Sequence, residues 1–200
     1  MLVTRRRLLS GVAAVAAAGT LGGCNTPPQR YEFPELTYTH LPPIRLDVAV
    51  VDVVDSYHPP MAEPNVEHLF PVPPARAMER WARDRLVAAG SNGSALFTIL
   101  RADVVEVPLA RTTGIKGVFT TDQSYRYDAT MEIRLDAENT SGLRRGTITA
   151  QARRSQTVAE NVTLNERERL WFEMTELLMR DIGSEIERNI DRYLAAFRIA

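Results

Sequence analysis

The sequence predicts an α+β fold: a two-layer sandwich in which two helices cover one face of a four-stranded, mostly antiparallel sheet. One reason is the succession of patterns along the chain, which reads strand, helix, three strands, helix. The other is the segment 125–135, where apolar and polar residues alternate without a break. Such alternation indicates a strand with one buried face and one wet face, as an antiparallel sheet covered on a single side requires.

The first half of the fold is predicted as a strand, a long loop and a helix. The strand covers 45–54, which is rich in β-branched residues. The loop 55–74 contains six prolines, and a loop of this length is usually functional or ordered by packing. The helix covers 75–89, is entered through two prolines and is stopped by Gly90. Its buried side is marked by Met78, Trp81, Ala82 and Leu86.

Three strands and a long helix make up the second half. The strands are predicted at 95–107, 125–135 and 144–158, with a turn at 139–142 before the last of them. The helix begins at a capping box, Thr163 to Glu166. Apolar residues then recur every three or four positions and predict a helix face that packs on the sheet. They are Trp171, Met174, Leu178, Ile182, Ile186, Ile190, Tyr193 and Phe197.

The N-terminus has the order of a bacterial secretory signal peptide. Arg5, Arg6 and Arg7 precede an apolar run, and small residues then lead to Cys24, the one cysteine of the chain. The apolar run, at about 14 residues, is shorter than the ~20 residues of a membrane-spanning helix. The stretch from Leu21 to Cys24 resembles the lipobox of lipoproteins. In those proteins the leader is removed and the cysteine carries a diacylglycerol, with acyl chains such as palmitate.

The resemblance to a lipobox divides the chain into three parts. Residues 1–23 are a signal peptide, 24–43 are the lipidated Cys24 with a proline-rich tether, and 44–200 are one periplasmic α+β domain. Export by the general secretory route and export by a twin-arginine route both fit the leader. The residue after the cysteine is Asn25, not the aspartate that retains lipoproteins in the inner membrane of enteric bacteria. The outer membrane is therefore favoured over the inner one, and an ordinary soluble secreted protein is the alternative to a lipoprotein.

The charge balance excludes some classes of partner. Without the three leader arginines, 21 basic side chains face 25 acidic ones, a net charge near −4. Such a balance argues against nucleic acid or an anionic lipid surface as the main partner.

The sequence shows no catalytic constellation, so we expect no enzymatic activity and no cofactor. A metal site could be drawn from His58, His68, Glu63 and Glu67, but their spacing matches no compact ligand motif. Histidines in a surface loop are the favoured interpretation, and no metal is expected. No serine lies in a G-x-S-x-G context, and no glycine-rich phosphate loop is present. A hydrolase without a recognisable motif remains an alternative.

One loop stands out as a possible contact with a partner. The segment 110–121 is far longer than a tight hairpin and carries Ile115, Val118 and Phe119 between glycines. These side chains form either a projecting contact or part of the core. The segment 66–81 is also apolar and is expected to fill the gap between the first strand and the first helix, with a contact to a partner as the alternative.

Taken together, these features resemble the ABC-type transport auxiliary lipoproteins. The features are the stretch Leu21 to Cys24, the proline-rich tether and a strand-helix-three-strand-helix body with Trp81-Ala82 in its first helix. More distantly, the body resembles the lipoprotein that plugs the lipopolysaccharide translocon. The resemblance implies a non-catalytic periplasmic subunit that assists lipid transport or outer-membrane assembly by contacting a transporter or an outer-membrane barrel. A periplasmic carrier of lipid or another ligand is the alternative.

Overall fold

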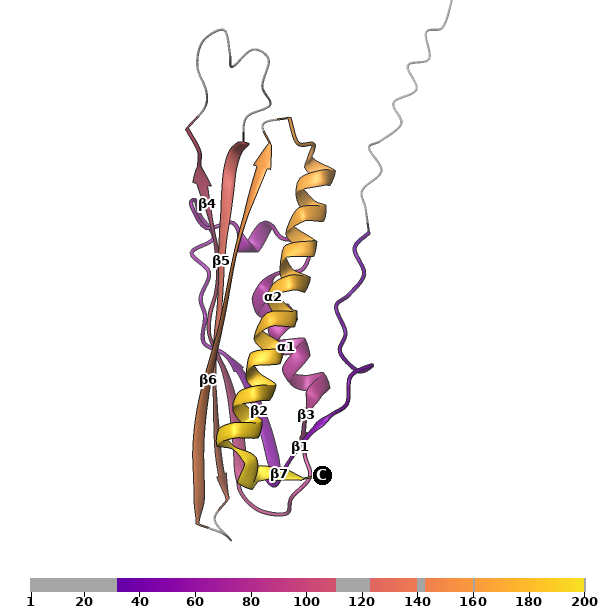
Figure 1. Ribbon diagram of the computed structural model, residues 1–200, viewed down its shortest axis with the longest axis vertical. Helices are drawn as coiled ribbons and strands as arrows, with labels where there is room; N and C mark the ends of the chain where they lie inside the picture. Colours follow the sequence, from indigo (N-terminus) through magenta and orange to yellow (C-terminus); the bar gives the residue numbers. More distant parts are fainter. Residues whose placement is uncertain (1–31, 111–122, 140–142, 160, 200) are drawn as a thin grey trace, which may run out of the picture. The chain divides into compact units, whose positions relative to one another are not determined.

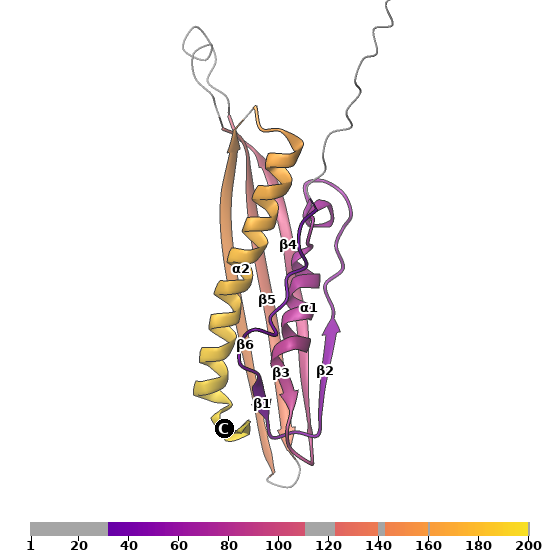
Figure 2. The ribbon, with the colours of Figure 1, turned by 90° about the vertical axis from the view of Figure 1, so that its right-hand side faces the viewer.

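The computed structural model describes residues 32–110, 123–139, 143–159 and 161–199. All of them belong to one compact unit, Tyr31–Ala200. Its large sheet has the strand order β2-β4-β5-β6. These strands are Val50–Asp55, Ser94–Pro108, Gln123–Asn139 and Arg144–Ala159. The helices α1, Pro74–Arg85, and α2, Leu164–Tyr193, lie on one face of this sheet, as Figures 1 and 2 show. The predicted α+β two-layer architecture is therefore confirmed.

The central strands follow the alternation seen in the sequence. β4 pairs antiparallel with β5, and β5 with β6, whereas β2 pairs parallel with β4 because α1 lies between them in the chain. The inward side chains of β5 are almost completely buried against the helices: Tyr127, Ala129, Met131, Ile133 and Leu135. Their neighbours in the sequence project from the opposite, helix-free face of the sheet.

The first predicted strand, 45–54, is in fact two strands in two sheets. β1, Ile44–Leu46, belongs to a small second sheet, and β2 belongs to the large one. The chain turns between them at 47–49, where Val48 is buried and its N–H donates to the Leu46 carbonyl at 2.8 Å. The sequence does not reveal this break, because valine has a high strand propensity and valines occur both within the break and directly after it.

The first helix is shorter than predicted. It ends at Arg85, and the next residues, Leu86–Ala88, form β3, which pairs parallel with β1. A second short strand, β7, Arg198–Ile199, pairs antiparallel with the other edge of β1 and was not predicted. Pairing with β1 satisfies the backbone of residues 86–88, and this long-range contact overrides the helical pattern there.

The last helix begins as predicted but its apolar face ends earlier. The Thr163 hydroxyl accepts from the Glu166 N–H, and the Glu166 carboxylate accepts from the Thr163 N–H, so the capping box is present. Tyr193 is the last helical residue and is 63% exposed, so its assignment to the buried face was wrong. Leu194 is buried in its place, and Phe197 is buried from the short 3-10 helix Ala195–Phe197.

Aromatic side chains join the loop, the helices and the sheet. Trp81 of α1 packs against Phe97 of β4, with ring centroids 6.2 Å apart. Trp171 of α2 stacks on Phe70 at 5.0 Å, and Phe70 comes from the segment 66–81. That segment includes the 3-10 helix Glu67–Leu69, and its Phe70 is buried against α2, whereas the prediction placed the segment between the first strand and the first helix. Within the described residues, no helix has both the length and the apolar character needed to cross a membrane.

Candidate functional site

The residues predicted to carry function lie outside the described part of the chain. Cys24 precedes residue 32, and Ile115, Val118 and Phe119 fall in the gap between 110 and 123. Both the lipidation of Cys24 and the contact through the long loop therefore stay predictions.

Of the four residues considered for a metal site, His58 and Glu67 have partners within the protein. His58 is exposed, and its Nδ1 lies 3.0 Å from the Ser56 carbonyl oxygen. Glu67 is only 3% exposed and is bound within the protein. Across the described ranges, no group of three or more His, Cys, Asp or Glu side chains is placed to hold a metal ion.

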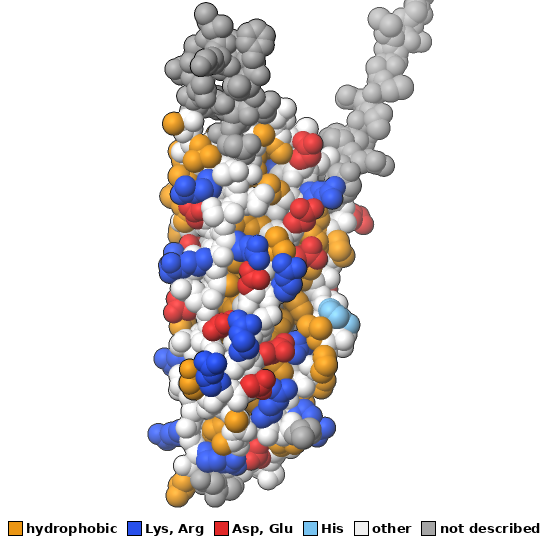
Figure 3. All heavy atoms as spheres, in the orientation of Figure 1, with side chains coloured by type: hydrophobic (Ala, Val, Ile, Leu, Met, Phe, Trp, Pro, Cys, Tyr) orange, Lys and Arg blue, Asp and Glu red, His pale blue; other side chains and the backbone are white. Residues whose placement is uncertain are grey.

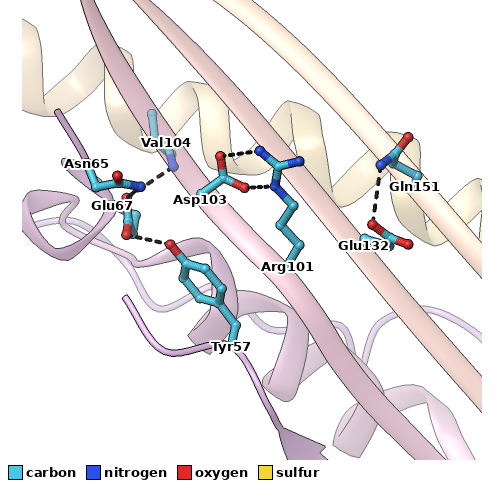
Figure 4. A network of polar contacts seen from close by, with 8 residues as sticks. All are labelled: Tyr57, Asn65, Glu67, Arg101, Asp103, Val104, Glu132 and Gln151. Atoms are coloured by element: carbon cyan, nitrogen blue, oxygen red, sulfur yellow. Dashed lines mark hydrogen bonds and ion pairs between the residues drawn. The ribbon is translucent and has the colours of Figure 1, made fainter. Parts of the chain in front are cut away.

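The buried Glu67 carboxylate ties the proline-rich loop to the sheet (Figure 4). Its Oε1 accepts from the Tyr57 hydroxyl at 2.7 Å, and its Oε2 accepts from the Val104 N–H of β4 at 3.1 Å and from Asn65 Nδ2 at 3.4 Å. Burial and the hydrogen bond to Glu67 raise the pKa of Tyr57, so the phenol stays protonated. A buried carboxylate with three donors is satisfied, and its role here is to order the loop.

The helix-free face of the sheet is covered by short-range polar pairs. Arg126 and Asp128 form an ion pair at 2.8 Å, and the Ser155 hydroxyl donates to Asp128 at 2.6 Å. These bonds lower the pKa of Asp128. The same pattern repeats at Arg101 with Asp103 and at Gln151 with Glu132, both drawn in Figure 4. Ion pairs and hydrogen bonds of this kind satisfy the acids on this face of the sheet.

A segment that we call the strap, residues 32–43, lies on the side of the two helices that faces away from the sheet (Figures 1 and 2). The ring of Phe33 stacks on Phe172 of α2 with centroids 5.2 Å apart. Glu35 accepts from Arg80 of α1 at 3.2 Å. The beginning of the strap therefore contacts both helices.

The other end of the strap is held by a buried arginine. The Arg85 guanidinium donates to the Pro42 carbonyl at 2.8 Å and pairs with Glu187 of α2, also at 2.8 Å. It lies over the Trp81 ring at 5.5 Å from the centroid. Because a buried charge is costly unless it is paired and hydrogen-bonded, these contacts hold the strap, α1 and α2 in one arrangement.

A groove of about 410 Å³ lies between the strap and α2. Leu36, Leu41, Trp81 and Met179 give it apolar walls, and Gly183 lets α2 approach the indole. A Cβ atom at Gly183 would lie 3.0 Å from Trp81 Nε1. Polar groups surround the apolar part: Thr37, Tyr38, His40, Arg85, Glu176, Arg180, Ser184 and Glu187. The groove is amphipathic and could hold a small amphiphilic ligand or a partner side chain.

Sequence reasoning missed this site because none of its polar residues forms a motif. Arg85 gave the one available signal, since it lies four residues after Trp81 and therefore on the same helix face. A charged residue on a buried face indicates a specific partner. Asp84 gave no such signal, although its carboxylate accepts from the Tyr38 N–H of the strap at 2.8 Å.

The exposed face of α2 carries charges of both signs. Figure 3 shows basic and acidic side chains interspersed over the face seen in that view. Arg169 pairs with Glu173 at 2.9 Å and Arg188 with Glu185 at 2.5 Å. A helix that binds an anionic membrane surface presents a largely basic polar face, and α2 does not.

Comparison with known proteins finds likeness in structure only. No family model and no curated protein matches the sequence. Similar solved structures include a minor lipoprotein from Acinetobacter baumannii, 11% identical with a TM-score of 0.38, covering 78% of this chain and 98% of that one. The rare lipoprotein B from Shewanella oneidensis is 9% identical with a TM-score of 0.39, covering 72% and 95%. A DUF330 protein from Xanthomonas campestris is 12% identical with a TM-score of 0.29, covering 76% and 97%. Bacterial lipoproteins are thus among the structural neighbours, at identities too low to transfer residues or activities.

Proposed function

We propose that this protein is a bacterial envelope lipoprotein, anchored by a lipid on Cys24, whose domain is a non-catalytic subunit of a lipid-transport or outer-membrane assembly system. It acts by binding a protein partner, a transporter or an outer-membrane barrel. Support for the anchor comes from the sequence, in which a basic and apolar leader ends in small residues at Cys24.

The observation that carries the proposal is the docked strap. Seven residues, 25–31, separate Cys24 from the first described residue, and even a fully extended chain of that length spans only roughly 28 Å. Beyond it, the strap is held by the Phe33–Phe172 stack and by Arg85. A lipid on Cys24 would therefore keep the domain close to the membrane, which suits a subunit that works beside a membrane protein.

A second candidate, a carrier of an amphiphilic ligand, is favoured by the groove beside the strap. Native purification followed by mass spectrometry separates the two functions. A transporter or barrel that co-purifies reproducibly supports the binding subunit. A bound lipid on a monomer without protein partners supports the carrier.

The anchor is tested by a Cys24→Ser variant expressed in the native host. We expect the variant to move from the washed membrane fraction to the soluble periplasm or culture medium, because the lipid is its attachment. Thr26→Ala, which leaves the lipobox intact, is the matched control and should stay with the membranes. Stable retention of Cys24→Ser in washed membranes contradicts the proposal.

A further inference from the structure

The two edges of the large sheet are protected to different degrees. Where β2 ends, the proline-rich loop continues along β4: the Val66 N–H donates to the Val104 carbonyl at 2.9 Å, and the Glu106 N–H donates to the Pro64 carbonyl at 2.8 Å. On the opposite edge, β6 pairs with β5 alone within the described residues, but it carries four arginines, and Asn189 of α2 donates to its Thr149 carbonyl at 2.8 Å. Covering loops and charged edge residues are two ways in which proteins prevent unwanted strand pairing.

The outer edge of β2 is the exception. Among the described strands β2 pairs with β4 alone, and Figure 2 shows it at the margin of the sheet. Residues 50–55 contain no proline, lysine or arginine to protect that edge. At the end of the strand the Ser56 N–H donates to the Ile99 carbonyl of β4 at 3.0 Å. Alternation along a strand then turns the backbone groups of Val51, Val53 and Asp55 away from β4.

The side chains at this edge are apolar and acidic. Val50 is 48% exposed and Val54 is 44% exposed, and Leu96 and Leu100 of β4 extend the apolar surface on the same sheet. Asp52 lies between the two valines, is exposed and makes no ion pair with another described residue. Cross-strand neighbours of opposite charge stabilise a sheet, so a strand beside β2 is favoured when it carries a basic residue opposite Asp52.

We propose that the outer edge of β2 binds an extended segment of the protein partner as a fifth strand. That segment carries apolar residues opposite Val50 and Val54 and Lys or Arg opposite Asp52. Backbone hydrogen bonds then supply affinity and the alternating side chains supply specificity. The inference rests on the proposed function for the existence of a protein partner, but the edge itself is open to direct test.

Pairing with a second copy of the chain is disfavoured by the charge of this edge. In an antiparallel pair of two β2 strands, the register that sets Val50 opposite Val54 also sets Asp52 opposite Asp52. Like charges directly opposite one another destabilise a sheet.

The test uses the full chain purified in detergent and a synthetic peptide, acetyl-Thr-Val-Thr-Arg-Thr-Val-Thr-amide. Valine, arginine and valine share one face of this peptide when it is extended. We expect saturable binding by isothermal titration calorimetry. Replacing the peptide arginine with glutamate should weaken it about fivefold, and N-methylation of alternate amides should abolish it.

Two variants locate the binding at β2. Val53→Pro removes an outward N–H without removing a donor from the β4 ladder and should weaken binding about tenfold, whereas Asp52→Lys should lose the preference for arginine over glutamate. Thr149→Pro on the opposite edge is the matched control and should bind as the parent does. No peptide binding, unchanged binding of N-methylated peptide, or a dimer that Val53→Pro dissociates would each overturn the inference. Because Cys24→Ser fractionation does not depend on this edge, the two proposals fail separately.

Discussion

Deletion of residues 163–200 is expected to abolish cooperative folding. The deletion removes α2, whose buried side covers the apolar face that Tyr127, Met131 and Ile133 present on β5. Each fully buried large apolar side chain contributes about 1.5–3 kcal/mol, and a whole domain is stable by only about 5–15 kcal/mol. The buried apolar residues of α2 are Trp171, Phe172, Met174, Leu178, Met179, Ile182, Ile186 and Ile190. Losing them together exceeds the stability of the domain.

Thermal denaturation followed by circular dichroism checks this prediction. We expect the full-length protein to show one sigmoidal transition and the truncated chain to show none, with binding of a dye that reports exposed apolar surface. A cooperative transition in the truncated chain would contradict the two-layer account of the core.

Replacing Trp81 with alanine is expected to cost about 3–5 kcal/mol of unfolding free energy, the usual range for a buried aromatic side chain. Trp81 is 1% exposed and packs on Phe97 of β4. It also lies beneath the Arg85 guanidinium and against Gly183 of α2. The substitution leaves a cavity where the sheet, both helices and the strap meet.

The measurement is equilibrium unfolding in urea, with Tyr193→Ala as the matched control. Both substitutions truncate an aromatic residue on a helix, but Tyr193 is 63% exposed, so its loss should change the unfolding free energy by less than about 0.5 kcal/mol. Equal effects of the two substitutions would show that Trp81 does not hold the layers together.

The parts of the fold that could be predicted are those set by local pattern. Strict alternation of apolar and polar residues predicted β5, and the capping box at Thr163 and Glu166 predicted the start of α2. The short strands β1, β3 and β7 could not be predicted, because each is defined by a partner far away in the sequence. A segment such as Leu86–Ala88 satisfies a helical pattern equally well until its pairing with β1 is known.

The candidate site was less predictable than the fold for a related reason. Glu67 lies in a proline-rich loop, where a charged residue is normally solvated, yet the loop folds over it and three donors satisfy it. The strap is predicted only as part of a semi-rigid, proline-rich tether, and its docking site depends on Phe33 meeting Phe172, more than a hundred residues later in the chain. Contacts of this kind arise only from the tertiary arrangement.

Mass spectrometry of the N-terminal peptide, isolated from membranes of the native host, tests the central claim most directly. If the protein is a lipid-anchored envelope subunit, the mature chain begins at Cys24 and the peptide carries the added mass of a diacylglycerol. A mature chain with a free Cys24 thiol, or one that keeps residues of the leader, would contradict the account.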